Sequence, residues 1–324
     1  DLHASLAPSE MCIRDSPHTL RGLTEVPELP DPKPVEGSSA QKLPVTVTDV
    51  EGNKVTIKST SRILALDLYG TLSRTLIGLG LGDKIVGRTV SSTEKQLHDR
   101  PVVTENGHVL NVEAVAGLKP SVIIADRSVG PKEALDQLRK SGIPVVLVDP
   151  HRSVGSTPQL IRTIADAVGK PDAGEALVKR TQEQIDQAKK QIAAWKPAKP
   201  MRVAFLYVRG NAGVFFILGS ENGASELIQG VGADDVASDK GITTLVPANA
   251  ESLVSINPDA IFVMRDGLAS TGGMKGLLAR AGVANTTAGR KQRVISIPDG
   301  ISLSFGPQTG EVLTAVAKAL YGVK

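Results

Sequence analysis

The hydrophobic positions of the chain repeat as a short helix followed by a wholly apolar strand. One copy covers residues 112–124 and the other residues 250–262. In each copy a proline marks the turn between the two elements, and a further helix and strand follow. Strands that are apolar on both faces lie in sheets covered on both sides. The repeat therefore predicts one α/β lobe that is built twice along the chain.

A single apolar stripe predicts a long helix between the two copies. Over residues 172–195 the stripe recurs every three or four positions, and most other positions are Lys, Arg, Glu or Gln. Pro197 and Pro200 end the helix. Such a helix would span roughly 36 Å at 1.5 Å per residue. We expect it to allow only modest opening and closing of the lobes.

These patterns give an α/β fold with two Rossmann-like lobes bridged by one long α-helix. The expected segments are a disordered lead and linker (1–43), an N-terminal lobe (44–170), the bridging helix (171–198) and a C-terminal lobe (199–324). The lead is assigned as disordered because it is rich in Pro, Ser, Glu and Asp and has no apolar periodicity.

Composition and missing motifs favour a binding protein. The net charge of +3, from 37 basic and 34 acidic side chains, argues against a nucleic-acid partner. One cysteine excludes a disulfide framework, a thiolate zinc site and an iron–sulfur cluster. No glycine-rich phosphate loop, nucleophile elbow or His-Glu-x-x-His motif occurs. Two lobes with no catalytic motif predict a ligand-binding cleft rather than an enzyme.

The start of the sequence lacks an export signal. A secretory signal needs a basic start and an apolar run, which residues 1–43 do not contain. Cys12 follows Ser9-Glu10-Met11, which does not fit a lipoprotein cleavage site. We interpret residues 11–16 as a sequencing artefact joined to a truncated reading frame, and expect the native signal and lipid-attachment cysteine to be missing.

The strand at 202–209 carries one pair of candidate ligand residues. Its period of two places Phe205, Tyr207 and Arg209 on one face, with the last two at the carboxyl end. An aromatic packing residue beside a solvated arginine is the simpler interpretation. A phenolate, however, is a hard anionic ligand for ferric iron, and a nearby guanidinium favours its charged form.

His108 is the candidate partner from the other lobe. It lies in a loop just before the first repeat helix, where α/β lobes present ligand residues. An imidazole can take the axial site opposite a phenolate, although a surface loop histidine is the alternative. Apolar residues 215–218 and the strand ending at Met264 would cover a porphyrin ring.

Further motifs resemble the periplasmic or lipoprotein binding components of ABC importers for haem, corrinoids and siderophores. The resemblance covers Val45 to the C-terminus and rests on Val47-Thr48-Asp49 with Gly52 and Val55, the repeats around Glu113 and Glu251, Gly219-Ser220 and Phe305-Gly306-Pro307. Within this family, Asn106-Gly107-His108 and the spacing of Tyr207 and Arg209 resemble the HmuT-type haem-uptake lipoproteins of actinobacteria.

The resemblance implies a class III substrate-binding fold that carries ferric haem b as its transported ligand. His108 and Tyr207 would be the axial ligands of the haem iron, and Arg209 would hydrogen-bond to Tyr207. Glu113 and Glu251 would dock to the permease, although two glutamates at helix starts are also favoured by the helix dipole. Nothing in the sequence selects the propionate partners, for which Arg88 and Arg127 are candidates; Met264 and Met274 would lie near the ring.

The resemblance also implies partners and a location. We expect a monomeric, membrane-anchored extracytoplasmic lipoprotein that serves the permease and ATPase subunits of a haem importer, with upstream haem-donor surface proteins. The alternative is a siderophore or corrinoid carrier of the same fold, disfavoured by few aromatics and no evident arginine cluster. A chelatase or haem-modifying enzyme is the lesser alternative, because it would need an acid/base pair in the cleft.

Overall fold

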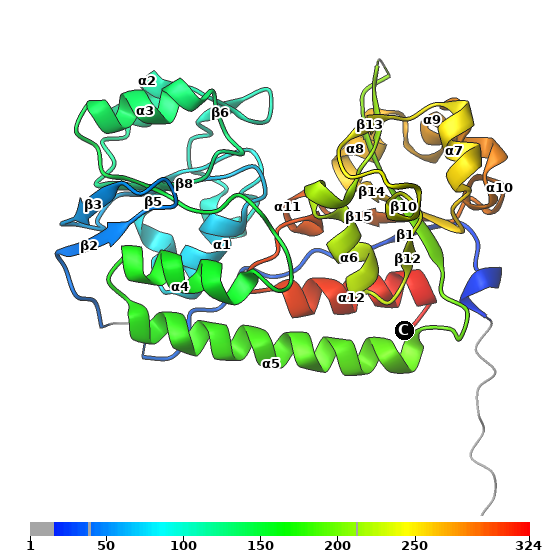
Figure 1. Cartoon of the computed structure of the whole chain (residues 1–324), viewed down its shortest axis with the longest axis horizontal. Helices are drawn as coiled ribbons and strands as arrows, with labels where there is room; N and C mark the ends of the chain where they lie inside the picture. Colours follow the sequence, from blue (N-terminus) through cyan, green and yellow to red (C-terminus); the bar gives the residue numbers. More distant parts are fainter. Residues whose placement is uncertain (1–15, 38–39, 212) are drawn as a thin grey trace, which may run out of the picture.

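The computed structural model describes residues 16–37, 40–211 and 213–324. His3 and Cys12, with most of the suspected artefact at 11–16, lie outside the described residues. Two α/β lobes lie side by side, and the helix α5 (Pro171–Trp195) runs along one side of both (Figure 1). In the described ranges, every helix is too short or too polar to cross a membrane.

The N-terminal lobe is built on a parallel four-stranded sheet of order β5-β4-β8-β9. The strands are β4 (Ile63–Leu66), β5 (Ile85–Gly87), β8 (Val122–Ala125) and β9 (Val145–Leu147). The helices are α1 (Thr71–Gly78), α2 (Val112–Gly117), α3 (Lys132–Lys140) and α4 (Thr157–Ala167). Two hairpins flank the sheet, β2 (Val45–Thr48) with β3 (Lys54–Ile57) and β6 (Thr104–Glu105) with β7 (Val109–Leu110).

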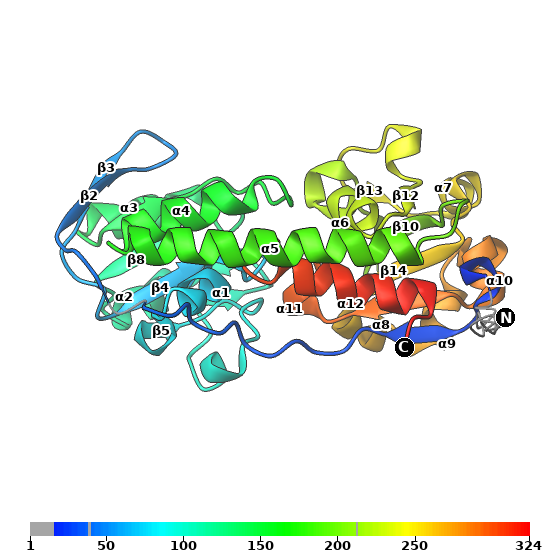
Figure 2. The same cartoon turned by 90° about the horizontal axis from the view of Figure 1, so that it is seen from below.

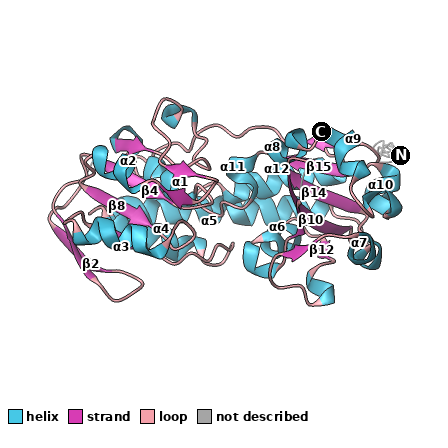
Figure 3. Ribbon diagram, turned by 90° about the horizontal axis from the view of Figure 1, so that it is seen from above, coloured by secondary structure: helices cyan, strands magenta, loops and turns pink. Residues whose placement is uncertain are grey.

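The C-terminal lobe has a seven-stranded sheet of order β1-β15-β14-β10-β11-β13, with β12 also paired to β10 (Figure 3). The strands are β1 (Leu23–Glu25), β10 (Arg202–Arg209), β11 (Val214–Ile217), β12 (Asp234–Asp235), β13 (Val246–Pro247), β14 (Ala260–Met264) and β15 (Val294–Ile297). The helices are α6 (Ala224–Gly230), α7 (Ala250–Ile256), α8 (Arg265–Ser270), α9 (Gly273–Ala279), α10 (Thr287–Lys291), α11 (Asp299–Ser302) and α12 (Thr309–Tyr321). Single 3-10 turns are η1 (Pro17–Thr19), η2 (Gly82–Lys84), η3 (Lys95–Leu97), η4 (Ser220–Asn222), η5 (Ser238–Lys240) and η6 (Val283–Asn285).

The repeated pattern corresponds to α2 with β8 in one lobe and α7 with β14 in the other. In the N-terminal lobe β8 pairs in parallel with β4, and in the C-terminal lobe β14 pairs in parallel with β10. Each helix is capped by an asparagine, Asn111 or Asn249, whose side chain accepts the N–H three residues on. Both faces of each sheet are buried, which is why these strands are wholly apolar.

The long helix was correctly predicted, and α5 contributes to the cores of both lobes. Leu177 packs in the N-terminal lobe, whereas Ala188 and Ile192 pack in the C-terminal lobe. The helix lies against α4 at one end and against α12 at the other. Because one stripe of α5 enters two cores, a bend in the helix would disturb both.

The expectation of disorder over residues 1–43 is wrong for the described part of that segment. Leu23–Glu25 pairs in parallel with β15, and the Val26 N–H donates to the Ser296 carbonyl at 2.8 Å. Further on, the Lys42 N–H donates to the Gly169 carbonyl at 2.8 Å. The prolines and acidic residues of this segment therefore belong to an extended chain that is held by backbone hydrogen bonds and that buries Val26 and Val35 in the lobe cores.

This N-terminal segment is a second connection between the lobes (Figure 2). After β1 it leaves the C-terminal lobe, and the Asp31 carboxylate accepts the N–H groups of Lys95 and Gln96 at 2.8 and 2.9 Å. The Val35 N–H then donates to the Gly78 carbonyl at 2.9 Å. The bridging helix therefore shares its role with an extended strap, which further limits how the lobes can separate.

Candidate functional site

Tyr207 lies near the carboxyl end of β10, inside the C-terminal sheet. β10 pairs in parallel with β14 on one side and antiparallel with β11 on the other. The Tyr207 ring is half-buried and packs against the same core cluster as Phe205. Phe216 lies directly opposite Tyr207 in the register, on the same face of the sheet. The strand thus fixes the ring on two sides while leaving part of it exposed.

Arg209 meets Tyr207 at the ring face. The guanidinium carbon lies 4.9 Å from the centroid of the Tyr207 ring, within cation–π range. Its Nη2 donates to Asp299 Oδ2 at 2.6 Å and lies 3.4 Å from the Met264 sulfur. The resemblance implied a hydrogen bond from Arg209 to the Tyr207 hydroxyl. The structure brings the two residues together, but with the guanidinium over the ring.

The apolar residues expected to cover a porphyrin do not all share the Tyr207 face. Phe215 and Ile217 are buried in the cluster on the opposite face of the sheet, and Arg280 lies over the Phe215 ring. Met274 packs against that same opposite cluster. Phe216 and Met264 remain near Tyr207 and Arg209, because a strand's alternate side chains point to opposite faces.

His108 is exposed and is the last residue in the turn of the β6–β7 hairpin. Asn106 and Gly107 have positive φ values of 48° and 88°, which Asn and Gly tolerate best. The His108 carbonyl accepts the Gly130 N–H at 2.9 Å. The Asn-Gly pair thus builds the turn that presents the histidine, and backbone contacts hold the hairpin to its lobe.

The two predicted ligands come from different lobes, as the sequence required. The β6–β7 hairpin of the N-terminal lobe lies on the side of the molecule away from α5 (Figure 1). Among the described residues, no hydrogen bond or ring contact joins His108 to Tyr207. Across the same residues, no group of three or more His, Cys, Asp or Glu could hold a metal ion by itself.

Glu113 and Glu251 are both exposed in the first turns of α2 and α7. These helices lie toward opposite ends of the long axis of the molecule (Figure 2). The two carboxylates therefore form a widely separated pair, one from each copy of the repeat.

The candidate propionate partners differ from each other. Arg127 binds Glu51 through two hydrogen bonds of 2.7 and 2.8 Å, and Asp136 at 2.9 Å. These carboxylates raise the pKa of Arg127 and occupy its donors, which argues against a further carboxylate partner. The Arg88 Nη1 makes only long contacts, 3.5 and 3.4 Å, to the carbonyls of Thr89 and Ser92.

Sequence reasoning missed a buried charged cluster at the carboxyl ends of β4 and β8. Asp67 and Asp126 directly follow these neighbouring parallel strands, and both pair with Arg152. Arg152 also lies over the Tyr69 ring, which packs against the core of the other lobe. Burial and the Asp67 charge raise the pKa of Asp126 to about 6. An aspartate immediately after each apolar strand was the available signal.

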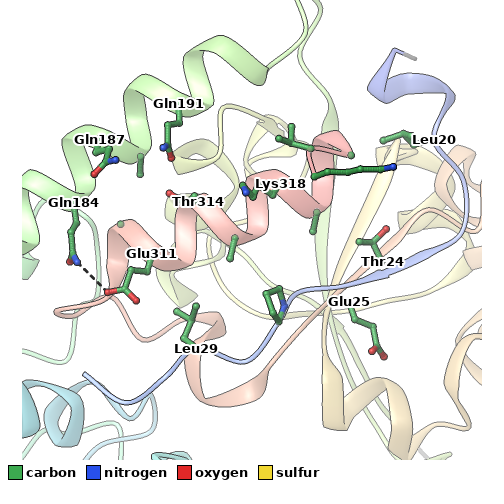
Figure 4. Close-up of a pocket in the computed structure, with 18 of the residues that line it drawn as sticks. Leu20, Thr24, Glu25, Leu29, Gln184, Gln187, Gln191, Glu311, Thr314 and Lys318 are labelled. Carbon is green, nitrogen blue, oxygen red and sulfur yellow. Dashed lines mark hydrogen bonds between the residues drawn. The ribbon is translucent and has the colours of Figure 1, made fainter. Parts of the chain in front are cut away.

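A surface groove of about 820 Å³ lies elsewhere, between the strap, α5 and α12 (Figure 4). A row of glutamines on α5, Gln184, Gln187 and Gln191, faces Thr314 and Lys318 of α12 across it. None of the predicted site residues lines this groove.

The comparisons with known proteins place this arrangement in a family. A family model described as periplasmic binding protein matches residues 68–300. The chain belongs to this family. Among curated relatives, the substrate-binding lipoprotein YvrC of Bacillus subtilis, uncharacterised and assigned to an ABC transporter, is 27% identical, with 86% of each chain covered. A cobalamin-binding protein of Halobacterium salinarum is 24% identical, covering 90% of this chain and 78% of its own.

A solved structure of the heme binding protein HmuT is more similar. It is 49% identical and covers 96% of this chain and 100% of its own, with a TM-score of 0.93. Structures of HmuT variants with alanine in place of a histidine, a tyrosine or an arginine match with TM-scores of 0.93, 0.92 and 0.93. The two-lobe class III architecture predicted from the sequence is therefore confirmed.

Proposed function

We propose that this protein is the extracytoplasmic haem-binding component of an ABC importer. It captures ferric haem b between its lobes and delivers it to the membrane permease. His108 and Tyr207 are the axial ligands of the haem iron, one from each lobe. The Arg209 guanidinium, which lies over the Tyr207 ring, would stabilise the negative charge of the ligated phenolate.

The observation that carries this proposal is the Tyr207–Arg209 pair at the carboxyl end of β10. A phenol and a guanidinium in contact form a suitable group for Fe(III), because the cation compensates the anionic ligand. The residues replaced in the HmuT variants support it. The histidine and tyrosine are 99 positions apart there, as are His108 and Tyr207, and the arginine follows by two, as Arg209 does.

The direct test is a titration of the purified protein with hemin, followed by absorbance. We expect a 1:1 complex with the spectrum of a tyrosinate-ligated ferric haem. Tyr207→Phe should lose this spectrum. Tyr321→Phe is the matched control and should keep it, because the Tyr321 hydroxyl is buried and donates to the Val231 carbonyl within the C-terminal lobe. Failure to form a stoichiometric complex would remove haem as the ligand.

Delivery to the importer would use Glu113 and Glu251. Their exposure at the first turns of α2 and α7 leaves both carboxylates available to basic residues of a permease. Replacing both with Lys should leave hemin affinity unchanged and abolish haem uptake in cells. Glu133→Lys is the control, since Glu133 is likewise exposed in the first turn of a helix, α3. Loss of hemin affinity in the double variant would place these residues in the pocket instead.

We propose a monomeric lipoprotein outside the cytoplasm that works with the permease and ATPase subunits and receives haem from surface donor proteins. We also propose that it binds haem without turnover. Incubation of the haem complex with a reductant should therefore return unmodified haem, as measured by product analysis.

A corrinoid carrier is the second candidate, favoured by the cobalamin-binding relative from Halobacterium. Competition between hemin and cobalamin separates the two ligands on one protein. We expect excess cobalamin to leave the hemin spectrum unchanged, whereas displacement of hemin would favour the corrinoid. A siderophore carrier would likewise be indicated if ferric siderophores displaced hemin.

A further inference from the structure

Arg209 has an acidic partner that the haem-ligand hypothesis does not use. Asp299, the first residue of α11, accepts its Nη2 at 2.6 Å through Oδ2. The other oxygen, Oδ1, accepts the backbone N–H of Asp266 at 2.9 Å. The side chains are only 32% (Arg209) and 19% (Asp299) exposed, so the ion pair is partly withdrawn from water. Both carboxylate oxygens of Asp299 are therefore committed, and Arg209 is held to a fixed carboxylate.

The surroundings restrict Arg209 to this position. Gly267 of α8 lies against it, and a Cβ on Gly267 would overlap the Arg209 guanidinium and the Val208 carbonyl. The Met264 sulfur lies on another side, at 3.4 Å from Nη2. A guanidinium held by Asp299 in this space lies on the Tyr207 ring face, 4.9 Å from the centroid.

The helix that carries Asp299 also contacts the N-terminal lobe. α11 lies between the two lobes (Figure 3). A Cβ on Gly300, the next residue, would overlap the hydroxyl of Thr93 from the opposite lobe. A few residues later, the Thr71 hydroxyl donates to the Ser304 carbonyl, again across the lobes. The carboxylate that holds Arg209 is thus one residue from the interlobe contact.

We propose that Asp299 is a positioning residue that sets Arg209 against Tyr207 and couples this pair to the contact between the lobes. When the N-terminal lobe shifts against Gly300, α11 carries Asp299 and with it Arg209. The rate at which the ligand is released then depends on how the two lobes are arranged. The effect on the ligand rests on the proposed haem-binding function. The claim that Asp299 holds Arg209 against the Tyr207 ring does not require a ligand.

The main test compares Asp299→Asn, Arg209→Ala and the double variant. The readouts are the rate of ferric haem transfer to excess apomyoglobin and the Fe(III)/Fe(II) midpoint potential of the complex. We expect Asp299→Asn to release haem about 10-fold faster, as for other groups that orient a metal ligand. The potential should shift in the same direction as in Arg209→Ala, and the double variant should be no worse than Arg209→Ala alone.

Two controls make the result specific. Asp266→Asn removes a neighbouring carboxylate but keeps the backbone N–H that meets Asp299, and should release haem like the wild type. Asp299→Glu retains the charge and should restore part of the loss. Additive effects in the double variant, or wild-type release and potential in Asp299→Asn, would overturn the positioning role.

A ligand-free crystal structure of Asp299→Ala separates this inference from the proposed function. Arg209 should leave the Tyr207 ring, whether or not the protein binds hemin. An unchanged Arg209 would overturn the inference even if hemin binds normally. Conversely, a wild-type protein that binds no hemin would overturn the proposed function and leave this geometric prediction to be judged by the crystal structure.

The link to the lobe contact is tested at Gly300. Gly300→Ala should force α11 and Thr93 apart and speed haem release about 3-fold, with Thr93→Gly restoring the wild-type rate in the double variant. Thr93→Gly alone measures any direct effect, and the thermal midpoint reports folding. Fast release that Thr93→Gly does not correct would contradict coupling through this contact.

Discussion

The two lobes present their proposed haem ligands on supports of different stiffness. Tyr207 lies within a central strand, with β14 and β11 paired on either side and Arg209 against its ring. His108 is exposed in the turn of a hairpin of two short strands. A residue in a central strand moves less than one at a hairpin turn, because fewer contacts must break to displace the latter. The C-terminal lobe thus offers a fixed ligand and the N-terminal lobe an adjustable one.

The largest expected difference between the lobes is in hemin affinity. Tyr207→Phe should weaken binding by about 100-fold or more, and His108→Ala by about 10-fold, since iron keeps its anionic ligand in the latter. Absorbance titrations of the two variants measure both losses. A larger loss at His108 than at Tyr207 would reverse the assignment of the fixed and adjustable ligands.

A second difference is the buried charge of the N-terminal lobe. The folded-state pKa of Asp126, about 6, lies above the ordinary value of 3.8 because of burial and the Asp67 charge. The folded protein therefore binds this proton more tightly than the unfolded chain, so the contribution of Asp126 to stability falls as pH rises from about 4 to 6.

Asp126→Asn tests this pH dependence. The variant cannot ionise at this position, so its stability relative to the wild type should increase between pH 4 and pH 7, by the order of 1–3 kcal/mol. Urea unfolding at several pH values gives the difference directly. A difference that stays constant, or that shrinks with rising pH, would contradict the raised pKa.

The smallest effect concerns the turn that presents His108. Gly107 and Gly52 both have positive φ, 88° and 83°, with open space where a Cβ would stand. Alanine at either position should cost about 1 kcal/mol of stability. Only Gly107→Ala should also weaken hemin binding, by about 3-fold, because Gly52 lies in the β2–β3 turn. Equal affinities of the two variants would show that the hairpin shape does not matter.

The parts of the fold that sequence could predict are those with local periodicity. The repeats α2–β8 and α7–β14 and the stripe of α5 are visible because each element buries one face or both. The strap was not predictable, since β1 has only three residues and pairs with β15 about 270 positions away. Most of its hydrogen bonds use the backbone, and Val26 and Val35, its buried apolar side chains, are too far apart in the sequence to form a periodic pattern.

The candidate site likewise has one part that the sequence predicts and one part that it does not. A period of two was enough to place Tyr207 and Arg209 together on β10. The position of the guanidinium over the ring depends on Asp299, 90 residues further along the chain, and on the space left by Gly267. Such distant contacts carry no signal in a single sequence, so the predicted hydrogen bond to the hydroxyl had no geometric basis.

The central claim, that Tyr207 ligates the iron of bound haem, is tested most directly by resonance Raman spectroscopy of the hemin complex. The protein contains three tyrosines, so it can be prepared with ring-deuterated tyrosine and compared with Tyr207→Phe. We predict an iron–phenolate vibration with enhanced tyrosine ring modes that shift on deuteration and vanish in Tyr207→Phe. Their absence from the wild-type complex, or their persistence in Tyr207→Phe, would contradict the account.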